Sequence, residues 1–109
     1  MQTPSPIQYN WSIWRGNDRR ISLRFSADLT GYSATISYRL GGVSINRPMT
    51  ISASTDFPGR YVVYTDYTPL ETKQFVYKQD ISYEIILQSP SGKKQTYMSG
   101  LLRPEGTMA

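Results

Sequence analysis

Residues 32–51, YSATISYRLGGVSINRPMTI, carry the clearest secondary-structure signal in the sequence. Apolar and polar side chains alternate along the first half, which is typical of a strand with one buried face. The Gly41-Gly42 pair then supplies the backbone freedom of a two-residue hairpin turn. The second half is therefore predicted to return antiparallel to the first. Pro48 predicts a sheet edge or a bulge there, because proline has no backbone N–H to donate.

The same alternation recurs on both sides of this hairpin. It predicts further strands at residues 8–14, 20–25, 61–65, 81–88 and 94–102. One helical turn is expected among them, near residues 69–74, because Thr68-Pro69-Leu70-Glu71 has the pattern of a capping box with proline at the first helical position. Short strands at this spacing, separated by turn residues, predict an all-β fold: a small antiparallel β-sandwich.

The length of 109 residues suits a single domain. We expect the sandwich to occupy residues 9–103. Residues 1–8 contain two prolines and residues 104–109 have little apolar content, so both are predicted to be flexible segments, an N-terminal arm and a C-terminal tail, that order on contact with partner subunits.

The side-chain inventory argues against an enzyme. The chain has no histidine and no cysteine, and its eight acidic residues are scattered along the sequence. The usual general base, thiol nucleophile and metal ligands are therefore missing, and we expect no catalytic residue, metal or cofactor. No apolar run approaches the roughly 18 residues that cross a bilayer, so no membrane contact is expected. The net charge of +4 leaves nucleic-acid binding open.

The segment WRGNDRRISLRF, residues 14–25, poses a choice between a phosphate-binding loop and a charged turn. Gly16 is not followed by the second glycine and the Gly-Lys-Ser/Thr ending of a phosphate-binding loop. Gly16, Asn17 and Asp18 are instead residues that favour turns. The segment is therefore predicted to be a turn leading into a strand whose arginines face solvent.

The order of these pieces resembles a recurring domain of tailed-bacteriophage virion proteins, over about residues 9–103. The stretches that carry the resemblance are Arg15-Gly16-Asn17-Asp18, Asp28-Leu29-Thr30-Gly31-Tyr32, Gly59-Arg60-Tyr61, Tyr83-Glu84-Ile85, Ser91-Gly92-Lys93 and Ser99-Gly100. The resemblance implies an immunoglobulin-like sandwich that serves as a structural or adaptor piece in baseplates, tails or fibre attachments, without catalysis. It also implies a location in the virion, and in the host cytoplasm during assembly.

Candidate partner-contact residues are Trp14, Arg15, Arg19 and Arg24. Trp14 falls out of step with the core-facing pattern of Tyr9, Trp11 and Ile13, and exposed tryptophan beside arginine is enriched at protein interfaces. Charge is also uneven along the chain. Residues 1–24 carry four arginines against one acid, and residues 56–84 carry five acids against three bases.

This asymmetry favours contact between copies of the protein, and other virion proteins are the further partners expected. Two alternatives remain open at this point. One is a small nucleic-acid-binding β-barrel, which would use Trp14 and Arg19. The other is a carbohydrate-binding, adhesive sandwich, in which tyrosine and tryptophan would stack on sugar.

Overall fold

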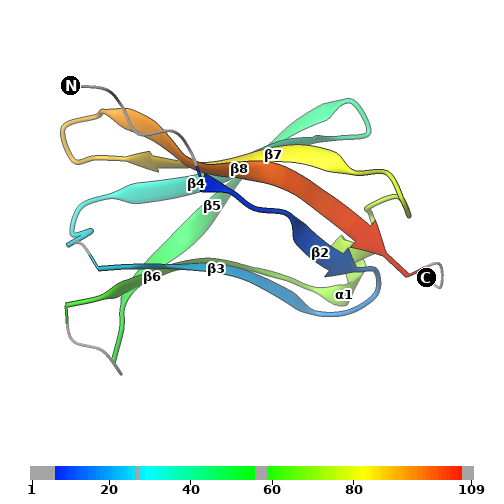
Figure 1. Ribbon diagram of the computed structural model, residues 1–109, viewed down its shortest axis with the longest axis horizontal. Coiled ribbons are helices and arrows are strands. Elements are labelled where there is room, and N and C mark those ends of the chain that lie inside the picture. Colours follow the sequence, from blue (N-terminus) through cyan, green and yellow to red (C-terminus); the bar gives the residue numbers. More distant parts are fainter. Residues whose placement is uncertain (1–6, 27, 56–58, 107–109) are drawn as a thin grey trace.

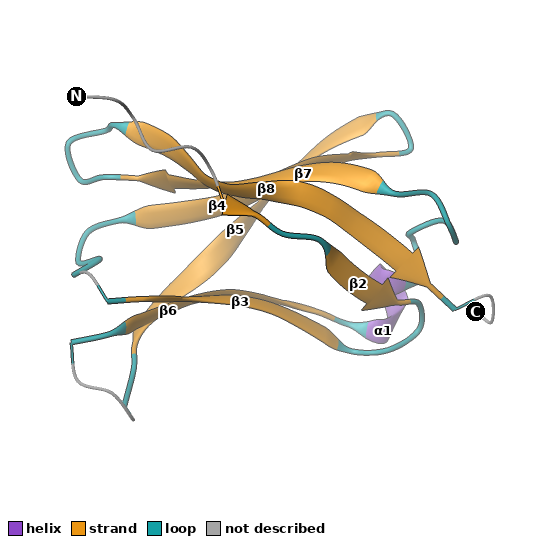
Figure 2. Ribbon diagram, viewed as in Figure 1, coloured by secondary structure: helices purple, strands orange, loops and turns teal. Residues whose placement is uncertain are grey.

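The computed structural model describes residues 7–26, 28–55 and 59–106. Within these residues the chain is all-β, with eight strands and one helical turn (Figure 2). The elements are β1 (Ile7–Gln8), β2 (Trp11–Trp14), β3 (Arg19–Phe25), β4 (Ser33–Leu40), β5 (Val43–Ala53), β6 (Tyr61–Tyr67), α1 (Pro69–Thr72), β7 (Ile81–Gln88) and β8 (Lys94–Glu105). The predicted capping box is confirmed at α1, where Thr68 and Glu71 bond to each other's backbone N–H.

The strands form one curled mixed sheet in the order β1-β8-β7-β4-β5-β6-β3, and β2 also pairs with β8. The curl produces two layers, with β4, β7 and β8 in one and β3 and β6 in the other, and β5 crosses between them (Figure 1). Residues 43–49 of β5 pair with β4, and residues 50–53 pair with β6. Pro48 therefore lies where β5 has one partner strand, which confirms the predicted edge.

The predicted antiparallel arrangement is wrong for the N-terminal strands. Both β1 and β2 pair in parallel with β8. The turn at residues 15–18 does not close a hairpin within one layer but carries the chain from β2 to β3 in the other layer (Figure 1). Because β2 and β3 are separated in this way, β2 pairs with the free edge of β8, which runs in the same direction.

The paired sheet also extends beyond the predicted domain boundaries. It begins at Ile7 rather than residue 9, and β8 continues to Glu105 rather than residue 103. The rest of the predicted arm, residues 1–6, and residues 107–109 of the predicted tail lie outside the described residues.

The core lies between the two layers. Its fully buried aliphatic side chains are Ile13, Ile21, Ile36, Val63, Ile85 and Leu102. Leu29 is also buried, and Trp11 packs against the core as expected. Tyr9 was expected to face the core as well but is 51% exposed. The reason is a break between β1 and β2 at Tyr9 and Asn10, which ends the regular alternation.

This break is held against both β7, which carries Tyr83, and β8, which carries Gly100 and Leu101. Tyr83 Oη donates a hydrogen bond to the carbonyl of Tyr9 at 2.5 Å, and Leu101 N donates to Asn10 Oδ1 at 3.0 Å. Between them, the backbone of Tyr9 lies so close to Gly100 that a Cβ there would sit 2.8 Å from the Tyr9 carbonyl carbon. Burial raises the pKa of Tyr83 to about 12, so its hydroxyl remains a hydrogen-bond donor well into the alkaline range.

Candidate interaction surfaces

Trp14 lies on the surface at the end of β2, as the sequence predicted. Its side chain is 55% exposed. The ring rests on the backbone of Gly106, where a Cβ would come within 3.4 Å of Trp14 Cε3. A shallow hollow of about 330 Å³ lies beside it, lined by Ser12, Trp14, Asn17, Asp18 and Arg19, and we call these five residues the Trp14 surface.

The guanidinium of Arg15 bonds to three carbonyls of its own chain. Nε donates to the carbonyl of Phe75 at 2.7 Å, Nη2 to that of Lys73 at 3.3 Å and Nη1 to that of Gly106 at 3.4 Å. These bonds tie the turn after β2 to the segment after α1 and to the end of β8. They give Arg15 a supporting role beneath Trp14, and its role as a contact residue stays a prediction.

Thr72 holds the same turn from within. This fully buried side chain accepts a hydrogen bond from Gly16 N at 2.9 Å and donates from its hydroxyl toward the carbonyls of Asn17 and Pro69, at 2.9 and 3.0 Å. A buried hydroxyl with both donor and acceptor used gives a rigid connection. Trp14 is thus an exposed aromatic side chain on a fixed base.

The other two predicted contact residues lie apart from each other. Arg19 donates from Nε to the carbonyl of Ser12 at 3.0 Å and lies over the Trp11 ring at 5.3 Å, as part of the Trp14 surface. Arg24 lies five residues further along β3, a distance of about 17 Å, on the outer face of that strand. The structure therefore brings Trp14, Arg15 and Arg19 together and leaves Arg24 separate.

Most arginines of this region already have partners, which weakens the case for a nucleic-acid groove. Arg20 forms an ion pair with Asp66 at 2.6 Å, in addition to the contacts of Arg15 and Arg19. A single-strand binding groove needs a row of free cations beside aromatic platforms. In the part of the chain that the structure describes, Arg24 has neither a hydrogen bond nor an ion pair, but it is remote from Trp14.

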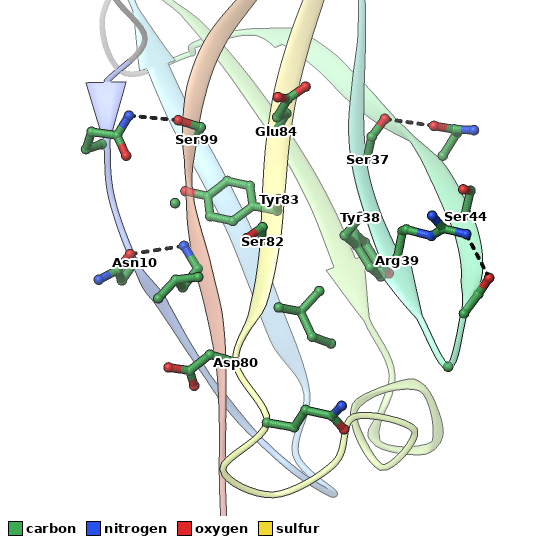
Figure 3. A pocket seen from close by; sticks show the side chains of 18 residues that line it. Asn10, Ser37, Tyr38, Arg39, Ser44, Asp80, Ser82, Tyr83, Glu84 and Ser99 are labelled. Atoms are coloured by element: carbon green, nitrogen blue, oxygen red, sulfur yellow. Dashed lines mark hydrogen bonds between the residues drawn. The ribbon is translucent and has the colours of Figure 1, made fainter.

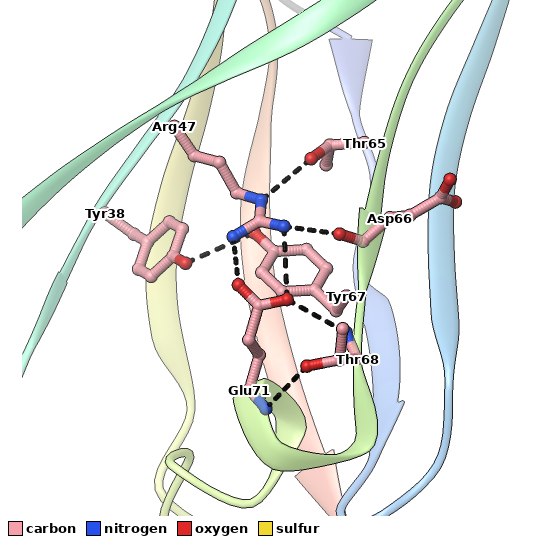
Figure 4. A network of polar contacts seen from close by, with 7 residues as sticks. All are labelled: Tyr38, Arg47, Thr65, Asp66, Tyr67, Thr68 and Glu71. Atoms are coloured by element: carbon pink, nitrogen blue, oxygen red, sulfur yellow. Dashed lines mark hydrogen bonds and ion pairs between the residues drawn. The ribbon is translucent and has the colours of Figure 1, made fainter.

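Arg47 forms a polar network that the sequence did not indicate (Figure 4). It reaches from β5 across to β6 and α1, where Nε donates to Thr65 Oγ1 at 2.8 Å, Nη1 to Glu71 Oε2 at 2.5 Å and Nη2 to the carbonyl of Asp66. Its guanidinium also lies 4.2 Å from the centre of the Tyr67 ring. Glu71 was predicted only as a helix cap, because nothing in the sequence places residue 47 opposite it.

This network gives the protein a defined acid sensitivity. The hydrogen bond from Arg47 lowers the pKa of Glu71, and that from Arg20 lowers the pKa of Asp66. A carboxylate whose pKa is lower in the folded state stabilises the fold above its unfolded-state pKa of about 4, and this contribution is lost as pH falls through the folded-state pKa. We expect a nearly constant melting temperature from about pH 7 to pH 5 and a fall below about pH 4.

Circular dichroism melts across this pH range test the expectation. Glu71→Gln removes one titrating group and should make the fall shallower. Glu105→Gln is the matched control, because the Glu105 carboxylate has no hydrogen bond or ion pair with the described residues. Equal acid slopes in the wild type and Glu71→Gln would contradict this account.

A second surface covers the outer face of β4, β7 and β8, where an open groove of about 950 Å³ lies (Figure 3). Cross-strand pairing places five polar side chains in one row across this face. The row, which we call the polar row, runs Asn46, Ser37, Glu84, Ser99 and Gln8. Each terminal amide bonds to its neighbouring serine, at 2.8 and 2.9 Å, and Glu84 at the centre has no hydrogen-bond or ion-pair partner among the described residues.

The polar row was missed because it depends on register. The sequence alternation placed its strand residues on a solvent-facing side, but it gave no means of aligning five strands. The aromatic residues at this groove, Tyr38 and Tyr83, are both buried. The groove therefore lacks the exposed aromatic platform that the carbohydrate alternative requires.

Among the described residues, no group of three or more His, Cys, Asp or Glu side chains is arranged to hold a metal ion. No helix in the same residues has the length and apolar character of a transmembrane helix.

Comparisons with known proteins show similarity in fold. No protein-family model and no curated protein matches the sequence. An uncharacterized protein from Listeria monocytogenes EGD-e, solved with glucose, magnesium and calcium, superposes with a TM-score of 0.60 at 12% identity over 83% of this chain and 8% of that one. A cycloalternan-degrading enzyme from Trueperella pyogenes gives 0.56 at 14% identity, over 91% and 14%.

A similar structure of comparable length comes from work on multimeric cell-adhesive interactions of VGSC beta subunits. Its TM-score is 0.54 at 12% identity, and the match covers 96% of this chain and 98% of that one. The chain thus spans a small part of the two bacterial proteins and nearly the whole of this third chain. Identities this low show a shared all-β fold alone.

Proposed function

We propose that this protein is a non-enzymatic structural or adaptor component of a tailed-phage virion, in the tail, baseplate or neck, with an immunoglobulin-like sandwich fold. It acts by holding neighbouring protein subunits together. The order of sequence motifs supports the phage assignment. The sandwich assignment is supported by the two-layer sheet and by the similarity in fold to a structure studied for multimeric adhesive interactions.

The observation that carries the proposal is the Trp14 surface. Binding energy at protein interfaces concentrates in a few large side chains, tryptophan above all, and a side chain that is already held in place loses less entropy on binding. Trp14 is more than half exposed, and the bonds of Arg15 and Thr72 fix the turn that follows it. A large apolar ring is unfavourable in water, and a partner protein that covers Trp14 would remove it from water.

Quantitative peptide mass spectrometry on density-purified particles from the source culture tests the assignment. We expect the protein in particles at a fixed multiple of three or six copies, which is the stoichiometry of a symmetric ring or spike. Absence from particles, with the protein left in the cell lysate, would overturn the virion assignment.

Trp14→Ala is expected to reduce the number of copies per particle by about tenfold or more, because truncation of a central aromatic residue commonly costs at least that factor in affinity. The melting temperature should hardly change, since the ring lies on the surface. Tyr9→Ala removes a similarly exposed aromatic ring, 51% against 55%, and is expected to leave incorporation unchanged. Normal incorporation of Trp14→Ala would show that partners bind elsewhere.

A further inference from the structure

The centre of the sheet face that carries the polar row has an unusual charge pattern. Ser37 lies opposite Glu84 in the β4–β7 pair, and one step beyond the paired Tyr38 and Tyr83 the same register places Arg39 beside Ser82. These four outward-facing residues form a square of two strands by two rows (Figure 3). The two charges occupy one diagonal and the two serines occupy the other.

Neither charge is neutralised within the described part of the chain. Glu84 has no hydrogen-bond or ion-pair partner there, and the bond of Arg39 goes to a neutral group, the Gly42 carbonyl at 3.2 Å. No ion pair joins Arg39 to Glu84. Elsewhere on the surface, by contrast, Arg20 and Arg103 pair with Asp66 and Asp80.

We propose that this face binds the same face of a second copy of the protein, across a two-fold axis that runs close to the Ser37–Ser82 diagonal. Rotation about this axis, which lies in the plane of the interface, places the side of the diagonal that carries Glu84 in one copy over the side that carries Arg39 in the other. Glu84 of each copy then lies over Arg39 of the other, and two equivalent ion pairs form. A face with one positive and one negative group placed in this way is complementary to itself, which is what a two-fold interface requires.

The shape of the residues between the charges agrees with this arrangement. Serines on the axis are small enough for the two sheets to approach closely, and their hydroxyls both donate and accept hydrogen bonds. Because the axis is oblique to the strands, the strands of the two copies cross, which is one of the two ways in which twisted sheets pack face to face. Asn46 and Gln8 flank the contact at either end of the polar row.

The proposed dimer uses a different face from the Trp14 surface and needs no other protein, so it goes beyond the proposed function. The test is analytical ultracentrifugation of the full chain, with the dimer dissociation constant as the readout. We expect a reversible dimer that weakens at high salt. Glu84→Arg and Arg39→Glu should each raise the dissociation constant by about tenfold or more, because each change brings like charges together twice.

Recombining the charges provides the decisive control. The double variant Glu84→Arg/Arg39→Glu restores opposite charges at both contacts and should regain most of the lost affinity. An equimolar mixture of the two single variants should form a heterodimer for the same reason, which a folding defect in either variant would not produce. Arg24→Glu, on the outer face of the other layer, should have no effect.

A chain that remains monomeric to about 1 mM, or single variants that dimerise like the wild type, would overturn the dimer. So would failure of both the double variant and the mixture to restore association. Trp14→Ala is expected to leave the dimer unchanged. A wild-type chain that forms no dimer but shows Trp14-dependent incorporation would therefore reject this inference alone. A wild-type dimer with normal incorporation of Trp14→Ala would reject the Trp14 surface alone.

Discussion

Gly100→Ala lowers the free energy of unfolding by roughly 3 kcal/mol, the largest loss expected from any single methyl group in the described chain. A Cβ at this position would collide with the Tyr9 carbonyl, and the φ angle of 155° is one that side-chain-bearing residues rarely adopt. The backbone of residue 9 must move away from β8. The hydrogen bond from Tyr83 Oη to the Tyr9 carbonyl is then broken, and the hydroxyl loses its partner.

Equilibrium urea unfolding measures the loss, and hydrogen exchange locates it. The amide of Leu101, bonded to Asn10, should exchange much faster in Gly100→Ala than in the wild type. Gln95→Ala is the control, because it changes an exposed side chain on the same strand. If Gly100→Ala is as stable as Gln95→Ala and the Leu101 amide stays protected, then the close approach of the two backbones is not a stabilising feature.

Arg47→Met is expected to cost about 2 kcal/mol of folding stability. Methionine keeps an unbranched stem of similar length against Tyr67 but removes every donor. Thr65 Oγ1, the Asp66 carbonyl and the Glu71 carboxylate then lose their shared partner. The side chains of Arg47 and Glu71 are 25% and 34% exposed, so water compensates for part of this loss, which places the effect below that of a fully buried pair.

Arg20→Met is the matched control, since Arg20 also pairs with a carboxylate and lies over a tyrosine ring. Its ion pair is more than half exposed on both sides, and exposed pairs contribute little to stability. Urea unfolding of the two variants should therefore give a much larger change at position 47 than at position 20. Equal changes would mean that Arg47 acts as an ordinary surface arginine.

The strands were predictable from sequence because each of them is a local pattern. Alternation in β3 and β4 predicts which side chains are buried, and Gly41-Gly42 connects Leu40 to Val43 as a two-residue turn requires. The capping box at Thr68 is equally local. In each case, neighbouring residues alone determine the outcome.

Pairing between distant strands was not predictable in the same way. Alternation along residues 8–14 does not indicate whether the strand pairs with β3 or with β8, and the parallel pairing depends on how the turn at residues 15–18 crosses between layers. The break at Tyr9 likewise depends on Gly100 and Tyr83, which lie more than 70 residues away. Long-range contacts of this kind leave no periodic signal.

The predicted contact residues show the same difference between local and long-range features. Trp14 was placed on the surface because it is out of step with its neighbours, which is a local property. That Arg15 bonds to three carbonyls follows only from the positions of α1 and the end of β8. The roles of Arg47 and Glu84 depend on which residues lie beside them on adjacent strands. The sequence does not show which residues these are.

The parallel pairing of the N-terminal strands with β8 has a mechanical consequence. The described chain enters β1 beside Met98 and leaves β8 just after Glu105, and the strands at these two points run side by side in the same direction (Figure 1). Tension applied between the ends would slide β1 and β2 along β8. Because their hydrogen bonds lie across the direction of pulling, they share the load and must break together, whereas bonds in an antiparallel hairpin pulled from its open end break one after another. The fold therefore resists stretching along its length.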